Sequence, residues 1–196
     1  MEMQADAGEG AGHVRYTYRL RLSNTARRSL LKEWGRCRWV WNECVAASKA
    51  AHRAREKCGP ARLGRMLTGW RRAKRWLREG ASVPQRQTVR DFAKSRAKAL
   101  KDIKARVPVP RRAGMPRFKM RDRAEPSLNY TRQGFRLKDG ALHLAGGITV
   151  RVVWSRDLPG DPSSVRIYRD ALGHWYASFV VPAAVEPLPD TGRTIG

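Results

Sequence analysis

The stretch RYTYRLRL at residues 15–22 decides how the rest of the chain must be arranged. Polar and apolar residues alternate along it, which predicts a half-buried β-strand. A long helical pattern follows this strand, and several further strand patterns appear only after residue 123. The sequence therefore predicts one sheet whose first strand is separated from the others by an inserted group of helices.

The inserted segment has apolar residues at three- and four-residue steps, the period of amphipathic helices. The stripe of the first predicted helix consists of Leu30, Trp34, Cys37, Trp41 and Val45. Asn24 or Thr25 is its predicted N-cap, and Gly59-Pro60 ends the pattern. A second predicted helix ends at Gly80, and its apolar residues are Leu63, Met66, Leu67, Trp70 and Leu77.

A third predicted helix begins near Pro84 and ends before Pro108, with a buried side made of Val89, Phe92, Leu100 and Ile103. Its opposite face is a ridge of cations at steps of three and four residues: Arg86, Arg90, Lys94, Lys98 and Lys101. Like charges at such spacing repel each other. The ridge predicts a polyanion along this face, because an ordinary solvated helix face would interleave glutamate with the lysines.

The later strand patterns lie at 135–138, 141–144, 148–154, 164–169 and 174–181. Asp139-Gly140 between the first two is a strong hairpin signal. Short strands at this spacing predict a small antiparallel barrel. The predicted fold class is therefore α+β, a barrel with a helical bundle inserted after its first strand.

Charge is concentrated in the helical middle of the chain, which has a formal net charge of +24 over 196 residues. Residues 25–123 contain 30 Lys and Arg against 7 Asp and Glu, and the remainder is nearly neutral. Such an excess is tolerable when an anionic partner neutralises it. Nucleic acid is the predicted partner and a membrane is not, because no stretch approaches the roughly eighteen apolar residues of a membrane span.

The stretch GMPRFKMRDRAEPSLNYT at 114–131 places Phe118 among several cations and then runs into a predicted strand. Cations suit phosphate groups, whereas Phe118 suits either a stacked base or an apolar anchor that holds the loop. The preceding residues 107–112, VPVPRR, predict an extended basic linker. The four tryptophans at helical spacing, Trp34, Trp41, Trp70 and Trp76, are predicted to be core residues in preference to stacking platforms for bases.

Catalytic patterns are weak in this sequence. Asp157, Asp161, Asp170 and Asp190 stand beside turn residues, and the four histidines are scattered. A metal-independent nuclease would need a His, Glu and Lys constellation that cannot be assembled here. The three cysteines lack metal-ligand spacing and are predicted to be free thiols.

Several segments together resemble the TnpB nucleases, which transposons encode and which are relatives of type V CRISPR effectors. The matching segments are Tyr16 to Leu20, Trp34 to Asn42, Gly114 to Lys119 (the family's G-x-P-R-F-K), Phe135 to Leu144, Ser164 to Phe179, and Thr191 to Gly196. Each segment alone is weak, but they occur in the family's order over nearly the whole chain.

The resemblance implies an oligonucleotide-binding-type β-barrel, the wedge domain, interrupted by a helical recognition lobe and followed by a RuvC-like nuclease domain. The implied boundaries are a disordered leader at 1–13, the first wedge strand at 14–24, the recognition lobe at 25–106, the rest of the wedge at 107–190, and the start of the nuclease domain at 191–196. The resemblance further implies a guide RNA and a target double-stranded DNA as partners, in the cytoplasm of a prokaryote.

The resemblance also implies which residues bind each partner. Guide RNA is expected on the basic surfaces, at Arg36, Arg38, Arg111, Arg112, Arg117, Phe118, Lys119, Arg121 and Arg123. The DNA motif that flanks the target (the PAM of CRISPR systems) is expected at Ser82, Gln85, Arg86, Gln87, Arg90, Lys94 and Thr131. Where relatives often have Gln-Gln, this chain has Gln85-Arg86-Gln87. Arg86 could read guanine, and either glutamine could read adenine.

Hydrolysis is expected beyond residue 196, because the family's first nuclease aspartate follows the segment that ends at Gly196. No metal or cofactor is therefore expected within the chain, and Mg²⁺ is expected for the nuclease domain. The alternative is a stand-alone RNA- or DNA-binding protein without catalysis, such as a ribosomal-type factor or a guided repressor that lost its nuclease. The charge pattern fits both alternatives equally well.

Overall fold

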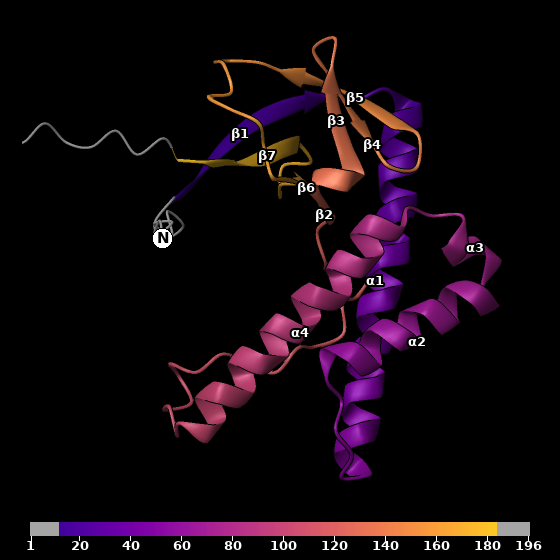
Figure 1. Ribbon diagram of the computed structural model, residues 1–196, viewed down its shortest axis with the longest axis vertical. Helices are drawn as coiled ribbons and strands as arrows, with labels where there is room; N and C mark the ends of the chain where they lie inside the picture. Colours follow the sequence, from indigo (N-terminus) through magenta and orange to yellow (C-terminus); the bar gives the residue numbers. More distant parts are fainter. Residues whose placement is uncertain (1–11, 184–196) are drawn as a thin grey trace, which may run out of the picture.

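Residues 12–183 are described by a computed structural model, in which a β-sheet is joined to a bundle of helices (Figure 1). The elements are β1 (His13–Arg21), α1 (Asn24–Arg53), α2 (Pro60–Ala73), α3 (Arg75–Arg78), α4 (Ser82–Lys104), β2 (Ser127–Thr131), the 3-10 helix η1 (Arg132–Gly134), β3 (Phe135–Lys138), β4 (Ala141–Leu144), β5 (Ile148–Val153), β6 (Ser164–Arg169) and β7 (Trp175–Pro182). The α+β class is confirmed, and all four α-helices follow the first strand.

Some predictions fall wholly or partly outside the described residues. The predicted start of a nuclease domain at 191–196 and the turn residue Asp190 lie there. Only Gly12 and His13 of the predicted leader are described, and His13 already belongs to β1. Within residues 12–183, no helix is both long enough and apolar enough to cross a bilayer.

The seven strands form one open antiparallel sheet in the order β2-β6-β7-β1-β5-β4-β3, so the predicted closed barrel is not confirmed. Directions alternate along this order, and the edge strands β2 and β3 therefore run the same way. The three residues of η1 link them, whereas side-by-side parallel strands need a crossover of roughly a dozen residues. The described sheet thus has no short route to closure between these two edges.

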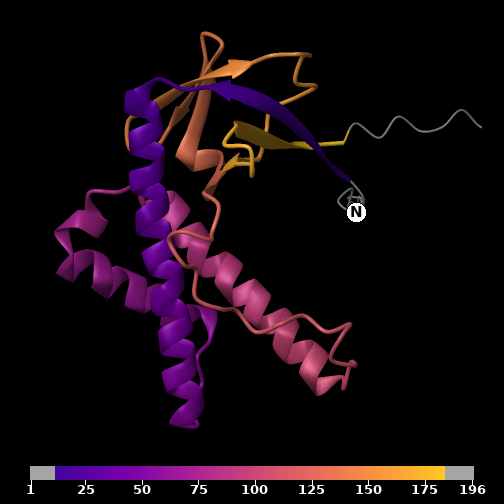
Figure 2. The same cartoon turned by 180° about the vertical axis from the view of Figure 1, so that it is seen from behind.

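The open sheet nevertheless curls around a single apolar core. Phe135 of β3, at one edge, and Phe179 of β7 have ring centroids 6.4 Å apart. Tyr130 of β2, at the other edge, belongs to the same buried cluster. The N-terminal half of α1 closes this cluster with Leu30 and Trp34, and Figure 2 shows α1 extending from the sheet into the helical bundle.

A second core lies among the helices and holds the bundle together. It contains Val40 and Cys44 of α1, Leu63 of α2, Leu77 of α3 and Phe92 of α4. Helix α1 contributes residues to both cores and therefore fixes the position of the bundle relative to the sheet. All three cysteines are free and buried, which confirms the predicted thiols, and burial raises the pKa of both Cys37 and Cys44 to about 12.

The helices differ from the sequence-based prediction in two boundaries and in the exposure of two residues. The N-cap of α1 is Ser23, whose hydroxyl accepts a hydrogen bond from the Ala26 amide. The second predicted helix is broken into α2 and α3 because Lys74 adopts an extended conformation. Leu100 and Ile103, predicted to be buried, are 41% and 42% exposed, because no described element packs over the last turns of α4.

Candidate nucleic-acid interface

A groove lies where α4 packs against the sheet, and two adjoining hollows of about 440 and 70 Å³ form it. The larger hollow is lined by Arg15, Gln87, Asp91, Lys94, Asn129, Tyr130, Thr131, Ser164, Val165, Arg166 and Val180. The smaller is lined by Val83, Arg86, Gln87, Arg90, Thr131 and Gln133. We call the two together the α4–sheet groove; its walls come from α4, β1, β2, η1, β6 and β7.

Local packing sets the position of α4 against the sheet. Asp91 accepts hydrogen bonds from Asn129 Nδ2 of β2 (2.7 Å) and from Gln87 Nε2 one turn earlier on α4 (2.8 Å). Gly134 of η1 lies so close to Val83 that a β-carbon there would meet its Cγ1 at 2.7 Å. A glycine at 134 therefore allows the first turn of α4 to approach the end of β2.

The α4–sheet groove is strongly cationic. Its lining includes five cations, Arg15, Arg86, Arg90, Lys94 and Arg166, and one carboxylate, Asp91, which already accepts the two amide bonds. Within residues 12–183, none of these five cations forms an ion pair. The ridge continues along α4 with Lys98 and Lys101, both exposed as predicted. Such an arrangement suits an extended polyanion.

Six of the seven residues predicted to contact DNA lie at or beside this groove. Arg86, Gln87, Arg90, Lys94 and Thr131 line it. Ser82 lies one turn before Arg86, and its hydroxyl accepts a hydrogen bond from Arg86 Nη2 at 3.2 Å.

Gln85 does not lie in the groove. It is completely buried, its Nε2 donates to the Leu77 carbonyl (2.9 Å), and its Oε1 accepts from Arg71 (2.6 Å). We therefore correct its predicted role. Gln85 faces the helical core because it lies one turn before the buried Val89, so it is placed to hold α3 rather than to read a base.

Arg36 also differs from its predicted role in RNA binding, because it is buried. It forms an ion pair with Glu33, and its Nε donates to the Trp76 carbonyl at 2.7 Å. The other carboxylate oxygen of Glu33 accepts the Ala81 amide at the start of α4 (3.1 Å). We call Glu33, Arg36, Arg71 and Gln85 the corner network, because their side chains bond the backbone that connects α3 to α4.

Arg71 completes the corner network. Its Nη1 donates to the carbonyls of Leu77 and Gly80, and its Nη2 donates to the carbonyl of Arg78. Gly80 leaves room for this packing, since a β-carbon there would lie 2.3 Å from Arg36 Cδ and 2.8 Å from Gln85 Nε2. Side-chain hydrogen bonds from the corner network thus add to the backbone hydrogen bonds that hold the corner between α3 and α4.

The segment 114–123 crosses α1 and is held there by side chains of that helix. We call this segment the strap. Trp41 Nε1 donates to the Arg117 carbonyl (2.8 Å), and Asn42 bonds both the amide and the carbonyl of Lys119. The Lys119 ammonium lies 4.0 Å from the Trp41 ring centre and 5.2 Å from that of Trp34. Burial lowers its pKa. Lys119 is therefore placed to anchor the strap.

The remaining residues predicted to bind RNA take different positions on and around the strap. Phe118 is 48% exposed, and the Lys49 ammonium lies 4.8 Å from its ring centre. Arg38 is half-buried and donates to the Lys119 carbonyl (3.2 Å). The exposed cations that remain open to a ligand are Arg111, Arg112, Arg117, Arg121 and Arg123.

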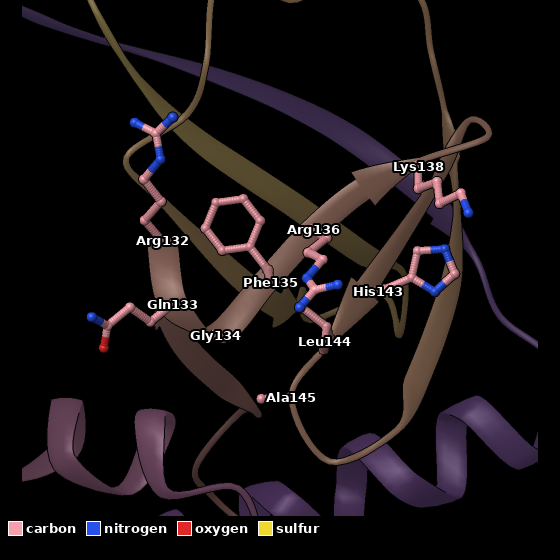
Figure 3. Close-up of a pocket in the computed structure, with 9 residues that line it drawn as sticks. All are labelled: Arg132, Gln133, Gly134, Phe135, Arg136, Lys138, His143, Leu144 and Ala145. Atoms are coloured by element: carbon pink, nitrogen blue, oxygen red, sulfur yellow. The ribbon is translucent and has the colours of Figure 1, made fainter.

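Apart from Thr131, the sequence interpretation missed the part of the groove that the sheet contributes. Arg15 and Arg166 lie on strands whose side chains alternate between the two faces of the sheet. Which face meets α4 depends on long-range strand pairing, so the sequence pattern alone did not place these residues in the groove. A second hollow, of about 700 Å³, was missed as well; it lies along the β3–β4 hairpin and η1. Figure 3 shows Arg136, Lys138 and His143 on this hairpin, with Arg132 at the other end of the hollow.

Metal ligation is not supported by the described part of the chain. Within residues 12–183, no group of three or more His, Cys, Asp or Glu side chains could hold an ion. Asp157, Asp161 and Asp170 do not converge on one another; Asp161 pairs with Arg132, and Asp170 accepts the His174 amide.

Comparison with known proteins places these features in context. Residues 13–57, which span β1 and α1, match the model of the family HTH_OrfB_IS605, described as a helix-turn-helix domain. Over 187 residues the chain is 26% identical to a Streptomyces pristinaespiralis protein named "Putative RNA-guided DNA endonuclease". That alignment covers 92% of this chain and 44% of the relative, so the chain spans less than half the relative's length. Together the two matches support the resemblance to the TnpB nucleases.

Proposed function

We propose that this chain is the part of an RNA-guided DNA endonuclease that binds guide RNA and recognises the flanking DNA motif. The single observation that supports the proposal best is the α4–sheet groove, with five cations and one already bonded carboxylate. The phosphates of a duplex backbone can pair with these cations, and polar side chains in the first turn of α4 can form hydrogen bonds with base edges. In this proposal the sheet acts as the wedge and the helices act as the recognition lobe.

The two partners occupy different surfaces in this proposal. The flanking duplex lies in the α4–sheet groove, where Arg86 and Gln87 reach base edges and Arg15, Arg90, Lys94 and Arg166 contact phosphates. The guide RNA lies on the exposed arginines of the strap and of the preceding linker. Base pairing with the guide reads the remaining target sequence. The relative is named an endonuclease. We propose that cleavage belongs to a RuvC-like domain whose carboxylates hold Mg²⁺, as the resemblance to the TnpB nucleases implies.

The test compares two charge-reversal variants of equal charge. Arg86→Glu/Arg90→Glu changes the groove, and Lys57→Glu/Arg65→Glu changes two exposed cations outside it. A library of short duplexes with randomised flanking bases is bound at several salt concentrations. We expect the groove variant to lose motif preference through Arg86 and to reduce the slope of log K against log salt by about one through the lost phosphate contact of Arg90. The control variant should keep the motif preference.

Sequencing of the RNA that co-purifies with the protein separates the two functional classes. A defined, structured RNA supports guided recognition, whereas random fragments favour a stand-alone binding protein without a guide. Arg117→Glu/Arg121→Glu should remove the RNA if the strap holds it. Unchanged RNA content in that variant would contradict the assignment of the strap.

A further inference from the structure

Three tryptophans, Trp39 of α1, Trp70 of α2 and Trp76 of α3, gather where these helices meet. The ring centroid of Trp39 lies 5.6 Å from that of Trp70 and 5.4 Å from that of Trp76. Both neighbouring rings are nearly perpendicular to the Trp39 ring. Trp39 and Trp70 pack on the helical core, but Trp76 is 42% exposed. The prediction that Trp76 is a core residue is therefore wrong, and the apolar exposure needs another explanation.

The backbone around Trp76 is held by hydrogen bonds, although the ring of Trp76 is open to solvent. Its carbonyl accepts Arg36 Nε (2.7 Å), and the next residue, Leu77, is completely buried. The corner network bonds the carbonyls of Leu77, Arg78 and Gly80 as well. A rigid aromatic ring loses little conformational entropy when a ligand stacks on it. The corner network thus preorganises an exposed ring.

Cations lie close to this ring in the sequence. Arg75 and Arg78 flank Trp76 in the sequence and are exposed, and the Lys74 ammonium lies 5.4 Å from the Trp39 ring centre. Of these three cations, Arg75 forms an ion pair: its Nε lies 3.0 Å from a carboxylate oxygen of Glu79. An exposed aromatic ring near cations fits a nucleotide, since the base can stack while the phosphate meets Arg78 and Lys74, neither of which forms an ion pair within residues 12–183. The same charges oppose docking of a second copy of this cationic chain.

We propose that Trp76, with Arg75, Arg78 and Lys74, forms a stacking platform for an unpaired nucleotide of a single strand. Figure 1 shows α3 on the opposite side of α1 from the C-terminal half of α4, so the platform and the far end of the cationic ridge face different ways. The platform extends the proposed function and rests on it, because it gives the same protein a second nucleic-acid contact. Its ligand is single-stranded, whereas the α4–sheet groove takes a duplex.

The test measures binding of the full chain to three fluorescein-labelled probes: short oligouridine, short oligodeoxythymidine, and a duplex of equal length. Trp76→Ala should weaken single-strand binding about tenfold, which is the effect of losing one stacked base. Trp76→Phe should keep most of the affinity, and duplex binding should stay unchanged in both variants. Leu172→Ala is the matched control, since Leu172 is 81% exposed on the β6–β7 turn. Comparison of the two single strands tells whether RNA or DNA is preferred.

Two outcomes would overturn the proposal. One is single-strand binding that Trp76→Ala leaves unchanged; the other is an equal loss for single strands and duplex. If Trp76→Ala does not fold, the variant Arg75→Glu/Arg78→Glu replaces it, because these exposed side chains can change without disturbing the core. Unchanged single-strand binding in that variant would also contradict the proposal. Light scattering adds a third check, since a smaller mass in Trp76→Ala would assign the ring to self-association. The groove variant Arg86→Glu/Arg90→Glu, which should lose duplex motif preference and keep oligouridine binding, separates failure of the platform from failure of the proposed function.

Discussion

The corner network and the α4–sheet groove contain similar polar residues that serve different purposes. The two regions are adjacent in the sequence, since Gln85 belongs to the corner network and Arg86 to the groove. Gln85 is completely buried and bonded on both sides of its amide, whereas the neighbouring Arg86 is exposed and bonded within the described residues to Ser82. In the corner network the chain itself supplies the acceptors, mainly backbone carbonyls and Glu33. In the groove the cations outnumber the available acceptors.

This difference separates polar residues that maintain the fold from those that await a ligand. A buried charge without its partner is costly, so the corner network must be complete in the folded chain. An exposed cation loses little when its partner is absent, so the groove can remain open until a polyanion arrives. The comparison therefore predicts that mutations in the corner network act on stability and mutations in the groove act on binding.

The largest effect is expected from Glu33→Ala. It leaves the buried Arg36 with only the more distant carboxylate of Glu79, 4.0 Å from its Nη2, and removes the acceptor of the Ala81 amide. We expect the free energy of unfolding to fall by about 3–5 kcal/mol, measured by urea denaturation. Glu56→Ala is the matched control, because it removes an exposed glutamate 2.7 Å from Arg62 and should cost at most about 1 kcal/mol. Equal losses in the two variants would contradict the distinction.

Gly80→Ala tests how tightly the corner is packed. The added methyl group would approach Arg36 Cδ to 2.3 Å, so we expect a loss of about 1–3 kcal/mol in thermal or urea unfolding. Gly69→Ala, in α2, meets no atom within 4 Å and should raise stability by up to about 1 kcal/mol through helix propensity. A neutral Gly80→Ala would show that the corner is loosely held.

The adjacent pair Gln85 and Arg86 gives the sharpest contrast. Gln85→Ala should lower the free energy of unfolding by about 1–2 kcal/mol, because the Leu77 carbonyl and Arg71 lose a buried partner. Arg86→Ala should leave stability within about 0.5 kcal/mol. It should weaken binding of the flanking duplex about tenfold. The contrast fails if Arg86→Ala unfolds the protein or if binding is unchanged.

The smallest effect concerns pH. Burial raises the pKa of Cys37 and Cys44 from an ordinary value near 9.0 to about 12, so each folded thiol resists ionisation. The stability this contributes is complete below pH 9.0 and is lost as pH rises towards about 12, with about 1 kcal/mol per thiol lost at pH 10. Unfolding titrations of the wild type and of Cys37→Ala/Cys44→Ala check this, and the variant should show the flatter alkaline limb. Parallel limbs would contradict burial of these thiols.

Periodicity in the sequence predicted most elements of the fold because helices and strands are local. The stripe from Leu30 to Val45 located α1, and the alternation at 15–22 located β1. Closure of the sheet could not be predicted in this way, since it depends on strand direction and on the short η1 link. The break at Lys74 was missed because the apolar spacing continues through it to Leu77.

The α4 side of the candidate site was predictable from helix periodicity, whereas of the sheet side only Thr131 was predicted, through the family resemblance. Arg86, Arg90 and Lys94 follow one helix face, whereas Arg15 and Arg166 enter the groove through long-range strand pairing. A signal for Gln85 was available, because it lies four residues before the buried Val89 and seven before the buried Phe92, on the same face. Arg36 gave a similar signal, since Glu33 lies one helical turn before it.

The most direct test of the central claim is photo-crosslinking of the purified protein to duplex DNA that carries photoreactive bases in the flanking motif. Peptide mapping should find crosslinks in the first turns of α4, at Ser82–Lys94, and around Asn129–Thr131. Crosslinks confined to other surfaces, with these two segments unmodified, would contradict the assignment of the α4–sheet groove.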